Sequence, residues 1–306
     1  MKQSNQASGC RLQVSDFFSA DVIVRDGVFV ALDEVDTLMP GTMVYCQNLH
    51  YLQKAGRNAL ISAIICPPDL VGELADSDVA VIVADDPRRR FFDLYVQLKE
   101  SGAILPQMSF GIGQDCRLHP SAVISPRSLL GSRVVVGANS VIEDYCRIGD
   151  DVEIGPNVVI GAEGLLTIRR PDGSLLRVSH AGGVEIGAGC QVLAGAVIAK
   201  SLFRRFTHIG CHSQIGIMSN IGHGAYLGEG CVVSGNSVIA GRARLGDRVW
   251  VGSSVSVAQG LTVGDQAQIK MGAVVVGDVA AGAVVSGNFA VSHRVNMARY
   301  LRGAAE

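Results

Sequence analysis

From residue 209 to residue 275, an aliphatic residue recurs at every sixth position without interruption. The residue four places after each of these is small or of modest size, so a second column keeps the same spacing. The aliphatic column consists of Ile209, Ile215, Ile221, Leu227, Val233, Ile239, Leu245, Val251, Val257, Val263, Ile269 and Val275. A hexapeptide period is typical of a parallel β-helix, in which each unit forms one flat side and three units complete a coil. Residues eighteen positions apart are therefore expected to stack, about 4.8 Å from each other.

The same period begins earlier in the chain, at Ile112, and runs through nine units before a first interruption. Residues 162–184 lose the period, and we interpret them as a loop that leaves the helix, with its turn at residues 169–173. Three further units follow, and with the twelve units that start at Ile209 they predict eight coils. The loop is a candidate wall of a cleft or a contact with a neighbouring subunit, because long ordered loops in compact domains are usually functional.

A second, smaller interruption lies between Ile198 and Ile209, which are eleven residues apart where two units require twelve. Four side chains that can carry positive charge gather there: Lys200, Arg204, Arg205 and His208. This bulge has two interpretations, a binding site for a nucleotide diphosphate or another phosphate, and a solvated irregularity.

The chain divides into three parts by this pattern. Residues 1–108 lack the period and predict a small α/β domain with a helix from Pro87 to about Glu100, capped by Asp86. Residues 109–287 predict the β-helix, including the loop at 162–184. From Gly282 the pattern dissolves, and we expect residues 288–306 to form a short helical tail.

Composition excludes several classes of function. A net charge of −2 gives no electrostatic footprint for nucleic acid. No apolar run is long enough for a transmembrane helix, and the polar N-terminus lacks the apolar core of a signal peptide, so we expect a cytoplasmic protein. The eight cysteines include no C-x-x-C pair. Four of them occupy the small inward column, which predicts core packing and no metal site; they are Cys116, Cys146, Cys190 and Cys231.

His223 is the candidate catalytic residue. It lies two places after Ile221, near an outer corner of the predicted coil, and Gly241 lies eighteen places further on. A neutral imidazole near its unperturbed pKa of about 6.5 takes a proton from an attacking amine or hydroxyl. A glycine at the stacked position lets a thioester carbonyl approach a backbone N–H that stabilises an oxyanion. The pair therefore indicates acyl transfer with direct attack by the acceptor.

Three segments resemble the UDP-3-O-acylglucosamine N-acyltransferases of lipid A biosynthesis: residues 43–51 (MVYCQNLHY), residues 119–122 with 161–164 (HPSA, GAEG), and residues 220–223 (NIGH). The resemblance implies a left-handed β-helix and a homotrimer. It implies that Tyr45, Asn48 and Tyr51 bind uridine, that Asn220 lies in the substrate site, and that His223 and Gly241 supply the base and the oxyanion donor. The implied reaction transfers an acyl group from acyl-carrier protein or coenzyme A to the amine of a UDP-amino sugar, without a cofactor.

The chain departs from that family at three points. Gly260 stands where the family has a second active-site histidine, and Gly216 stands where it has an aspartate. The tail after Asn288 is also shorter than the family's C-terminal extension. We therefore expect a divergent member with a different sugar, acyl length or donor.

Three alternatives remain open from the sequence. The nearest is an O-acyltransferase with a hydroxyl acceptor. A second is a non-catalytic nucleotide-sugar sensor or scaffold. A third is a zinc-dependent hydratase, for which His208, His212 and His223 are the candidate ligands, although they occupy different places in the six-residue frame.

Overall fold

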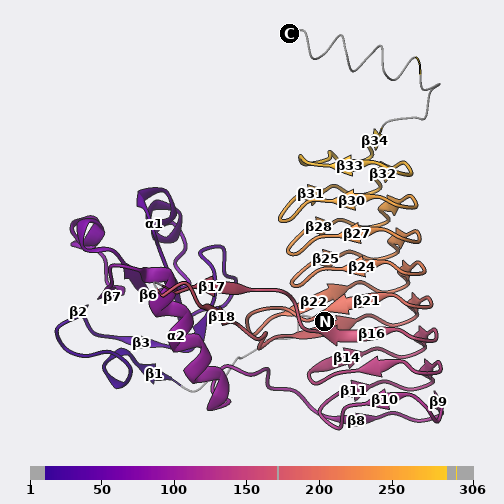
Figure 1. Ribbon diagram of the computed structural model, residues 1–306, viewed down its shortest axis with the longest axis horizontal. Helices are drawn as coiled ribbons and strands as arrows, with labels where there is room; N and C mark the ends of the chain where they lie inside the picture. The colour runs from indigo at the N-terminus through magenta and orange to yellow at the C-terminus, as the bar shows by residue number, and fades with distance from the viewer. Residues whose placement is uncertain (1–10, 171, 288–293, 295–306) are drawn as a thin grey trace.

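The computed structural model describes residues 11–170, 172–287 and 294, which form an N-terminal α/β domain beside a tall solenoid (Figure 1). The predicted tail, residues 288–306, lies outside the described residues except for residue 294. No helix among the described residues is long and apolar enough to cross a membrane. The described cysteines are free, and Cys146, Cys190 and Cys231 are buried as predicted, while Cys116 is partly exposed.

A five-stranded sheet forms the centre of the N-terminal domain. Its order is β2 (Ile23–Arg25), β7 (Ala80–Val83), β6 (Ile61–Cys66), β5 (Thr42–Tyr45) and β4 (Ala31–Leu32), parallel except for β2. The remaining elements are β1 (Leu12–Gln13), paired with β3 (Val28–Phe29), two 3-10 helices (Val14–Asp16 and Pro68–Leu74), α1 (Leu49–Gly56) and α2 (Pro87–Glu100). Alternate strand residues contact the two α-helices: Met43 packs with α2, and Val44 packs with α1.

The two helices differ in how well the sequence predicted them. The helix at residues 87–100 is confirmed, and the side chain of Asp86 accepts a hydrogen bond from the Arg89 N–H at 3.0 Å. The helix α1 was not predicted from the sequence: residues 43–51 contain the end of β5 and the start of α1, which begins at Leu49. Its N-cap is Asn48, whose Oδ1 accepts from the Tyr51 N–H at 3.2 Å.

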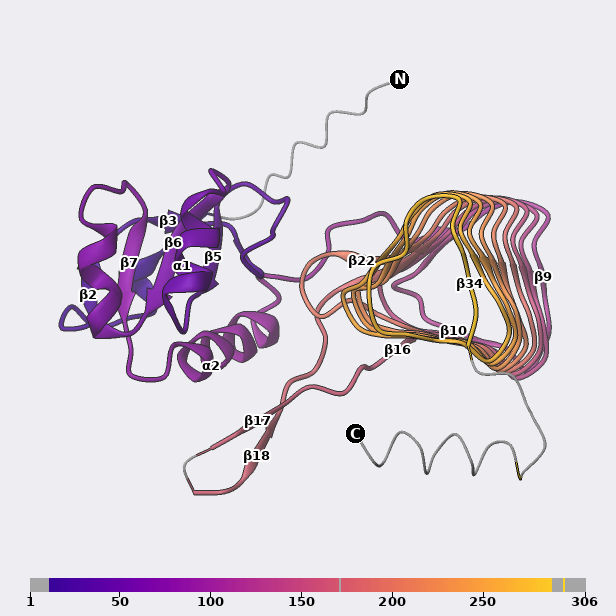
Figure 2. The same cartoon turned by 90° about the horizontal axis from the view of Figure 1, so that it is seen from above.

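Three parallel sheets enclose the core of a left-handed β-helix with a triangular cross-section (Figure 2). The first sheet comprises β10 (Val123–Ile124), β13 (Val141–Ile142), β16 (Val159–Ala162), β21 (Val197–Ala199), β24 (Asn220–Ile221), β27 (Val238–Ile239), β30 (Ser256–Val257) and β33 (Val274–Val275). The second comprises β8 (Gly111–Ile112), β11 (Leu129–Leu130), β14 (Cys146–Ile148), β19 (Gly183–Ile186), β22 (Phe206–Ile209), β25 (Tyr226–Leu227), β28 (Arg244–Leu245) and β31 (Thr262–Val263). The third comprises β9 (Arg117–Leu118), β12 (Val135–Val136), β15 (Glu153–Ile154), β20 (Gln191–Val192), β23 (Gln214–Ile215), β26 (Val232–Val233), β29 (Trp250–Val251), β32 (Gln268–Ile269) and β34 (Val284–Val285).

The sheets confirm the predicted coils and extend them at one end. Eight described strands in each of two sheets and nine in the third give the eight predicted coils plus one strand. The extra strand is β34, which pairs with β32. The aliphatic pattern ends near Gly282 as predicted, while the backbone ladder continues to Val285, within the range 109–287 predicted for the β-helix.

The glycines that follow the aliphatic column are explained by crowding between coils. A Cβ on Gly222 would lie 2.5 Å from the backbone nitrogen of Gly241 in the next coil. Gly222 itself does not have a positive φ. The left-handed conformation occurs two residues after it, at Gly224, and the corner of the next coil has a non-glycine residue in this conformation, Arg242 (φ +61°). The corner therefore requires close backbone contact at one position and a positive φ at another.

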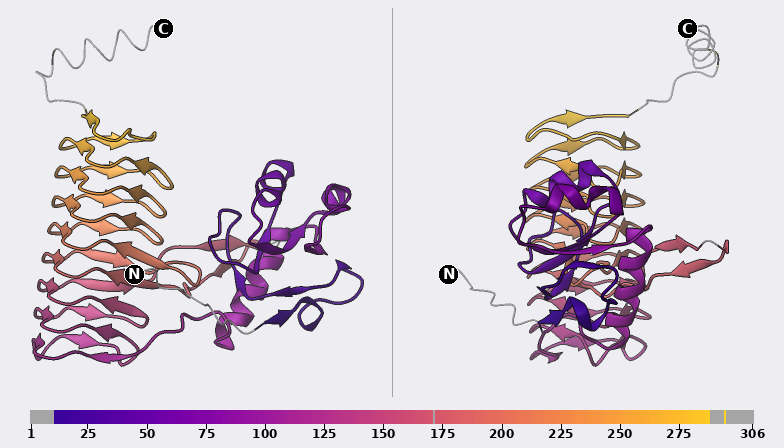
Figure 3. Two further views of the ribbon diagram at one scale, coloured as in Figure 1. Left: turned by 180° about the vertical axis from the view of Figure 1, so that it is seen from behind. Right: turned by 90° about the vertical axis from the view of Figure 1, so that its left-hand side faces the viewer.

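The two interruptions of the repeat are where the N-terminal domain packs on the solenoid (Figure 3). The loop at 162–184 forms a hairpin of β17 (Thr167–Arg169) and β18 (Leu175–Arg177) that projects from the triangle. Its base and the bulge join the core of the N-terminal domain, through Ile168, Val178, Leu202 and Phe203.

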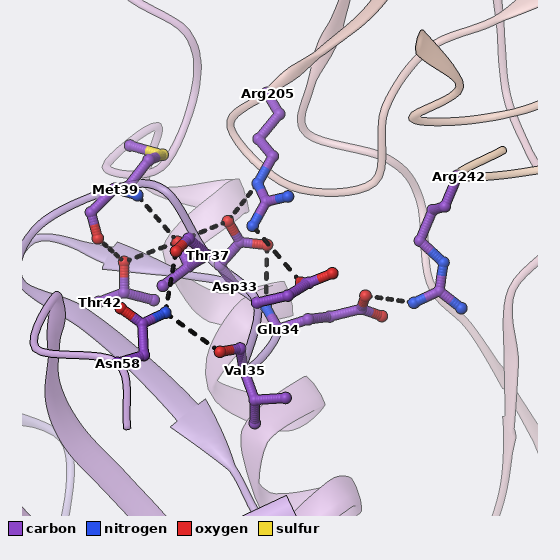
Figure 4. Close-up of polar contacts among 10 residues, drawn as sticks. Asp33, Glu34, Val35, Thr37, Met39, Thr42, Asn58, Arg205 and Arg242 are labelled. Carbon is purple, nitrogen blue, oxygen red and sulfur yellow. Dashed lines mark hydrogen bonds and ion pairs between the residues drawn. The ribbon is translucent and has the colours of Figure 1, made fainter. Parts of the chain in front are cut away.

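Polar contacts fix the same interface. The Tyr95 hydroxyl lies 2.6 Å from the Leu202 carbonyl oxygen and 3.0 Å from that of Ser179, so a single proton is offered to two acceptors. Arg205 pairs with Asp33, and Arg242 pairs with Glu34, as Figure 4 shows. The solenoid and the N-terminal domain are thus held together by apolar packing and by ion pairs.

Candidate active site

His223 lies at a corner of the solenoid, directly over Gly241. The register pairs Ile221 with Ile239, as the period predicted, so the corners that follow these residues stack. A Cβ on Gly241 would lie 2.6 Å from His223 Nε2, which places the imidazole in the space that a side chain would occupy. Among the described residues, none accepts a hydrogen bond from the Gly241 N–H. A base and an available backbone donor therefore lie side by side.

A second histidine packs against His223 from the loop at 162–184. The ring centroids of His180 and His223 are 5.4 Å apart with an interplanar angle of 65°. His180 is buried, and neither of its ring nitrogens makes a hydrogen bond with a described residue. Gly164 is required beside it, because a Cβ there would lie 2.6 Å from His180 Nε2. His180 was not among the residues predicted from the sequence, since it lies outside the periodic columns.

Glu163 anchors His180 and the bulge. Its carboxylate accepts a hydrogen bond from the His180 backbone N–H at 2.7 Å and lies 3.3 Å from the ring Nδ1. The other oxygen is 3.0 Å from Lys200 Nζ. Burial on its own would raise the pKa of Glu163, but the contacts with His180 and Lys200 hold this pKa at about 2. The carboxylate is therefore charged at neutral pH and links the loop to the bulge.

The surroundings of His223 change its acidity. Burial lowers its pKa to about 4, and positive charge on His180 and on Arg242 contributes in the same direction. The expectation of an unperturbed pKa of about 6.5 was wrong, because the sequence showed a surface corner and not the segments that cover it. The imidazole is neutral throughout the neutral pH range, as a general base requires.

A cleft of about 320 Å³ opens at this corner, between the solenoid and the N-terminal domain. The solenoid contributes His223, Gly224, Tyr226, Arg242 and Arg244, and the bulge contributes Ser201, Leu202, Phe203, Arg205 and Phe206. The N-terminal domain contributes Asp33, Glu34, Leu38 and Met39. The walls combine apolar side chains with three arginines and two carboxylates, and the carboxylates pair with Arg205 and Arg242. This lining suits a ligand that has an apolar part and an anionic part able to compete for an arginine.

Two of the three residues assigned to uridine line a neighbouring pocket of about 310 Å³, together with Gln47 and Lys54. Tyr51 is exposed there, and Tyr45 is half-buried with its ring 5.1 Å from that of Phe91. Asn48 does not line this pocket, since its carbonyl oxygen caps α1.

Asn220 lies apart from both pockets. Its backbone pairs with Val197 and Val238 in the first sheet, and its side chain is exposed on the flat face of the solenoid. The resemblance placed this residue in the substrate site, whereas the structure places it on the face next to the corner.

The three histidines considered as zinc ligands occupy separate surroundings. His208 stacks on Tyr226 with centroids 4.8 Å apart, and its Nδ1 lies 3.3 Å from Glu185. His212 occupies a left-handed corner with φ +58°. Within the described part of the chain, no group of three histidine, cysteine, aspartate or glutamate residues is arranged to hold a metal ion.

Gly216 and Gly260, the two glycines at which the chain departs from the resembled family, have different surroundings. A Cβ on Gly216 would lie 2.5 Å from the backbone nitrogen of Gly235, so a carboxylate side chain does not fit there without a shift. A Cβ on Gly260 would meet no described atom within 4 Å, although the φ of this residue is +72°. Steric crowding therefore explains the first glycine, and backbone conformation favours the second.

Comparison with known proteins agrees with this architecture. Residues 134–163 and 206–241 match the family "Bacterial transferase hexapeptide (six repeats)", and residues 242–276 match "Hexapeptide repeat of succinyl-transferase". No curated protein matches the chain. These segments of the solenoid thus match models of hexapeptide repeats from bacterial transferases.

Solved structures resemble this chain to different degrees. The UDP-N-acetylglucosamine acyltransferase of Bacteroides fragilis is 22% identical, with a TM-score of 0.51, and the match covers 64% of this chain and 75% of that one. The O-acyltransferase of Moraxella catarrhalis is 26% identical over 60% of this chain and 76% of its own, with a TM-score of 0.36. The acetyltransferase domain of PglB from Neisseria gonorrhoeae is 17% identical over 80% and 96%, with a TM-score of 0.26. The first of these shows that the fold is one used by acyltransferases.

Proposed function

We propose that this protein transfers an acyl group from a thioester to the amine of a UDP-amino sugar, with His223 as the general base. The observation that carries the proposal is the imidazole of His223 over the Gly241 N–H, at the mouth of a cleft between two domains. The hexapeptide repeats and the acyltransferase fold support the same reaction class.

The chemistry follows from that pair. The acceptor nitrogen attacks the thioester carbonyl carbon, and its proton passes to the neutral imidazole of His223. The carbonyl oxygen becomes an oxyanion that accepts a hydrogen bond from the Gly241 N–H. Collapse of this intermediate breaks the carbon–sulfur bond, and the leaving thiolate takes the proton from the imidazolium. The products are an amide and a thiol, and His223 is neutral again.

The low pKa of His223 has two opposite effects on this step. Burial keeps the imidazole unprotonated at neutral pH, so its lone pair is available in nearly every molecule. The same burial makes it a weaker base than a free imidazole, so proton transfer has to accompany formation of the carbon–nitrogen bond. Glu163 and His180 act here as positioning residues, since they hold the loop against the imidazole.

The acceptor is proposed to be a nucleotide sugar because a second pocket with two tyrosines adjoins the catalytic cleft. Tyr45 and Tyr51 present aromatic surface for a uracil ring, and Lys54 adds positive charge. The donor is proposed to be acyl-carrier protein or coenzyme A, and the working unit a homotrimer, as the sequence resemblance implies. A cytoplasmic location is proposed from the composition of the chain.

The test is mass spectrometry of products after incubation with UDP-amino sugars and short or long acyl thioesters on both carriers. The panel includes 3-O-acylated UDP-glucosamine and UDP-N-acetylglucosamine, which distinguishes amine from hydroxyl acceptors. We expect one acyl group to be added to an amine. His223→Ala should lower kcat/KM by about 10²–10⁴-fold.

The matched control is His119→Ala, which removes an exposed histidine at the far end of the solenoid and should leave the rate unchanged. Full activity in His223→Ala would exclude the proposed base. Nucleotide binding without transfer to any acceptor would favour a sensor or scaffold.

A further inference from the structure

The pocket with the two tyrosines and the cleft with His223 meet at one ion pair. Glu34 and Arg242 are the two residues that line both spaces. Arg242 directly follows Gly241 at a left-handed corner, and its side chain extends from the solenoid to Glu34 in the N-terminal domain (Figure 4). A ligand that occupies both spaces therefore has to pass this pair.

Two arginines, Arg205 and Arg242, pair with carboxylates of the N-terminal domain, and their contacts differ in how firmly they are held. Arg205 lies 3.9 Å from Asp36 in addition to its pair with Asp33. The Asp33 side chain is 2% exposed and pairs with Arg205, and it also accepts from the Thr37 hydroxyl at 3.0 Å and from the Glu34 N–H at 2.8 Å. The Arg242 and Glu34 side chains are 43% and 30% exposed. No other described residue contacts the Glu34 carboxylate through a hydrogen bond. Solvent-exposed pairs of this kind contribute little to stability and exchange partners readily.

The free donors of Arg242 are suited to phosphate. Its guanidinium uses one Nη nitrogen for Glu34, and none of its other N–H groups donates to a described residue. A guanidinium binds phosphate through two parallel hydrogen bonds, so an incoming phosphate oxygen competes directly with the carboxylate. Lys54 lines the tyrosine pocket next to it and adds a second positive charge.

We infer that Arg242 binds the diphosphate of the acceptor and that Glu34 occupies the phosphate position until the acceptor arrives. The inference rests on the proposed function in that the acceptor is taken to be a nucleoside diphosphate sugar. In this arrangement, the uracil ring of the ligand lies in the tyrosine pocket, and the diphosphate displaces Glu34 from Arg242. The sugar then enters the cleft of His223. Because Arg242 adjoins Gly241, this contact also fixes the distance between the diphosphate and the oxyanion donor.

The replacement of Glu34 by phosphate on Arg242 predicts how the protein distinguishes uridine from UDP. A ligand without phosphate gains nothing from Arg242, so uridine should bind in the tyrosine pocket with the ion pair intact. A diphosphate gains the guanidinium and has to overcome Glu34. Removing the arginine should therefore weaken diphosphate binding alone, and removing the carboxylate should strengthen it.

The experiment is calorimetric titration of uridine and UDP into the wild-type protein, Arg242→Gln and Glu34→Gln. We expect Arg242→Gln to weaken UDP binding by at least about tenfold, since charge-assisted bonds to phosphate are lost, and to leave uridine binding unchanged. Glu34→Gln should tighten UDP binding several-fold. Arg248→Gln is the matched control and should leave UDP binding unchanged, because this exposed arginine also occupies a left-handed corner (φ +55°) but lines neither space.

Equal losses for uridine and UDP in Arg242→Gln, or weaker UDP binding in Glu34→Gln, would overturn the inference. Absence of UDP binding to the wild-type protein would overturn it as well. The titration needs no turnover, so Arg242-dependent UDP binding without acyl transfer would support the inference and reject the proposed reaction. Acyl transfer to a UDP-amino sugar, with UDP binding unaffected by Arg242→Gln, would support the proposed reaction and reject the inference.

Discussion

Two kinds of structure can be compared in the solenoid: the uniform coils from residue 209 to residue 275, and the two segments that interrupt the repeat. They differ in where their side chains are buried. In the coils, each unit buries its aliphatic residue and leaves its outer corner open to solvent. The loop at 162–184 and the bulge between Ile198 and Ile209 instead bury some of their side chains against the outside of the solenoid or in the N-terminal domain: Ile168, Val178 and His180 from the loop, and Leu202 and Phe203 from the bulge.

His223 shows what this difference produces. It occupies an ordinary corner of an ordinary coil, where the period alone predicts an exposed histidine. His180 from the loop lies against its ring, and the residues of the bulge form the cleft beside it. The coils therefore set the position of the base, and the interruptions set its environment.

The largest effect is expected when the bulge loses its anchor. Phe203 packs against the rings of Phe91, Phe92 and Tyr95, with centroids 5.8–6.5 Å apart. Phe203→Ala should destabilise the contact between the domains by about 3–5 kcal/mol. Denaturant unfolding followed by circular dichroism should then separate into two transitions. Val276→Ala, at a position that is 80% exposed, serves as the control and should unfold like the wild-type protein. A single unchanged transition in Phe203→Ala would show that the bulge does not hold the domains together.

An intermediate effect is expected inside the coils, where two glycines can be compared. Gly222→Ala pushes a Cβ against the backbone of Gly241 and should cost about 2–3 kcal/mol. Gly260→Ala meets no atom within 4 Å but keeps a positive φ, and should cost about 1 kcal/mol. Thermal unfolding measures both. If the two variants were equally stable, the assignment of the glycine column to crowding between coils would be wrong.

The smallest effect is expected from the loop histidine. His180→Phe keeps an aromatic ring against His223 but removes a group that can carry positive charge. The pKa of His223 should therefore rise from about 4 toward its ordinary value, without reaching it, because burial and Arg242 still lower it. The acid limb of the pH profile of kcat/KM should move to higher pH, with KM little changed. An identical profile would show that His180 has a structural role only.

The same contrast explains what the sequence could predict. The coils, their register and the stacking of His223 on Gly241 depend on contacts between residues eighteen apart, which a fixed period reveals. The strand β34 was missed because its coil lacks the aliphatic spacing, although its backbone still pairs. The helix α1 was missed because the aromatic residues around Asn48 were interpreted through a resemblance and not as an N-cap.

The site residues that were missed have a common cause. His180 lies in a segment without a period, and Glu34 meets Arg242 across 208 residues of sequence. Contacts of this kind depend on how two domains dock, and no local pattern specifies them. The bulge was noticed because of its spacing and charge, and one of those charged residues, Arg205, does pair with Asp33. The bulge's apolar residues Leu202 and Phe203, which were not noticed, pack in the core of the N-terminal domain.

Titration of the His223 imidazole by NMR in histidine-labelled protein tests most directly whether the interrupting segments create a buried, neutral base. His223→Gln assigns the signal. A histidine whose folded pKa lies below its unfolded value stays neutral as the pH falls from about 6.5 to about 4, and over that range its charging opposes folding. We predict that His223 remains neutral at about pH 5.5 in the wild-type protein, between these two values. A midpoint near 6.5 would contradict this, and would mean that His223 is an ordinary surface histidine of the solenoid.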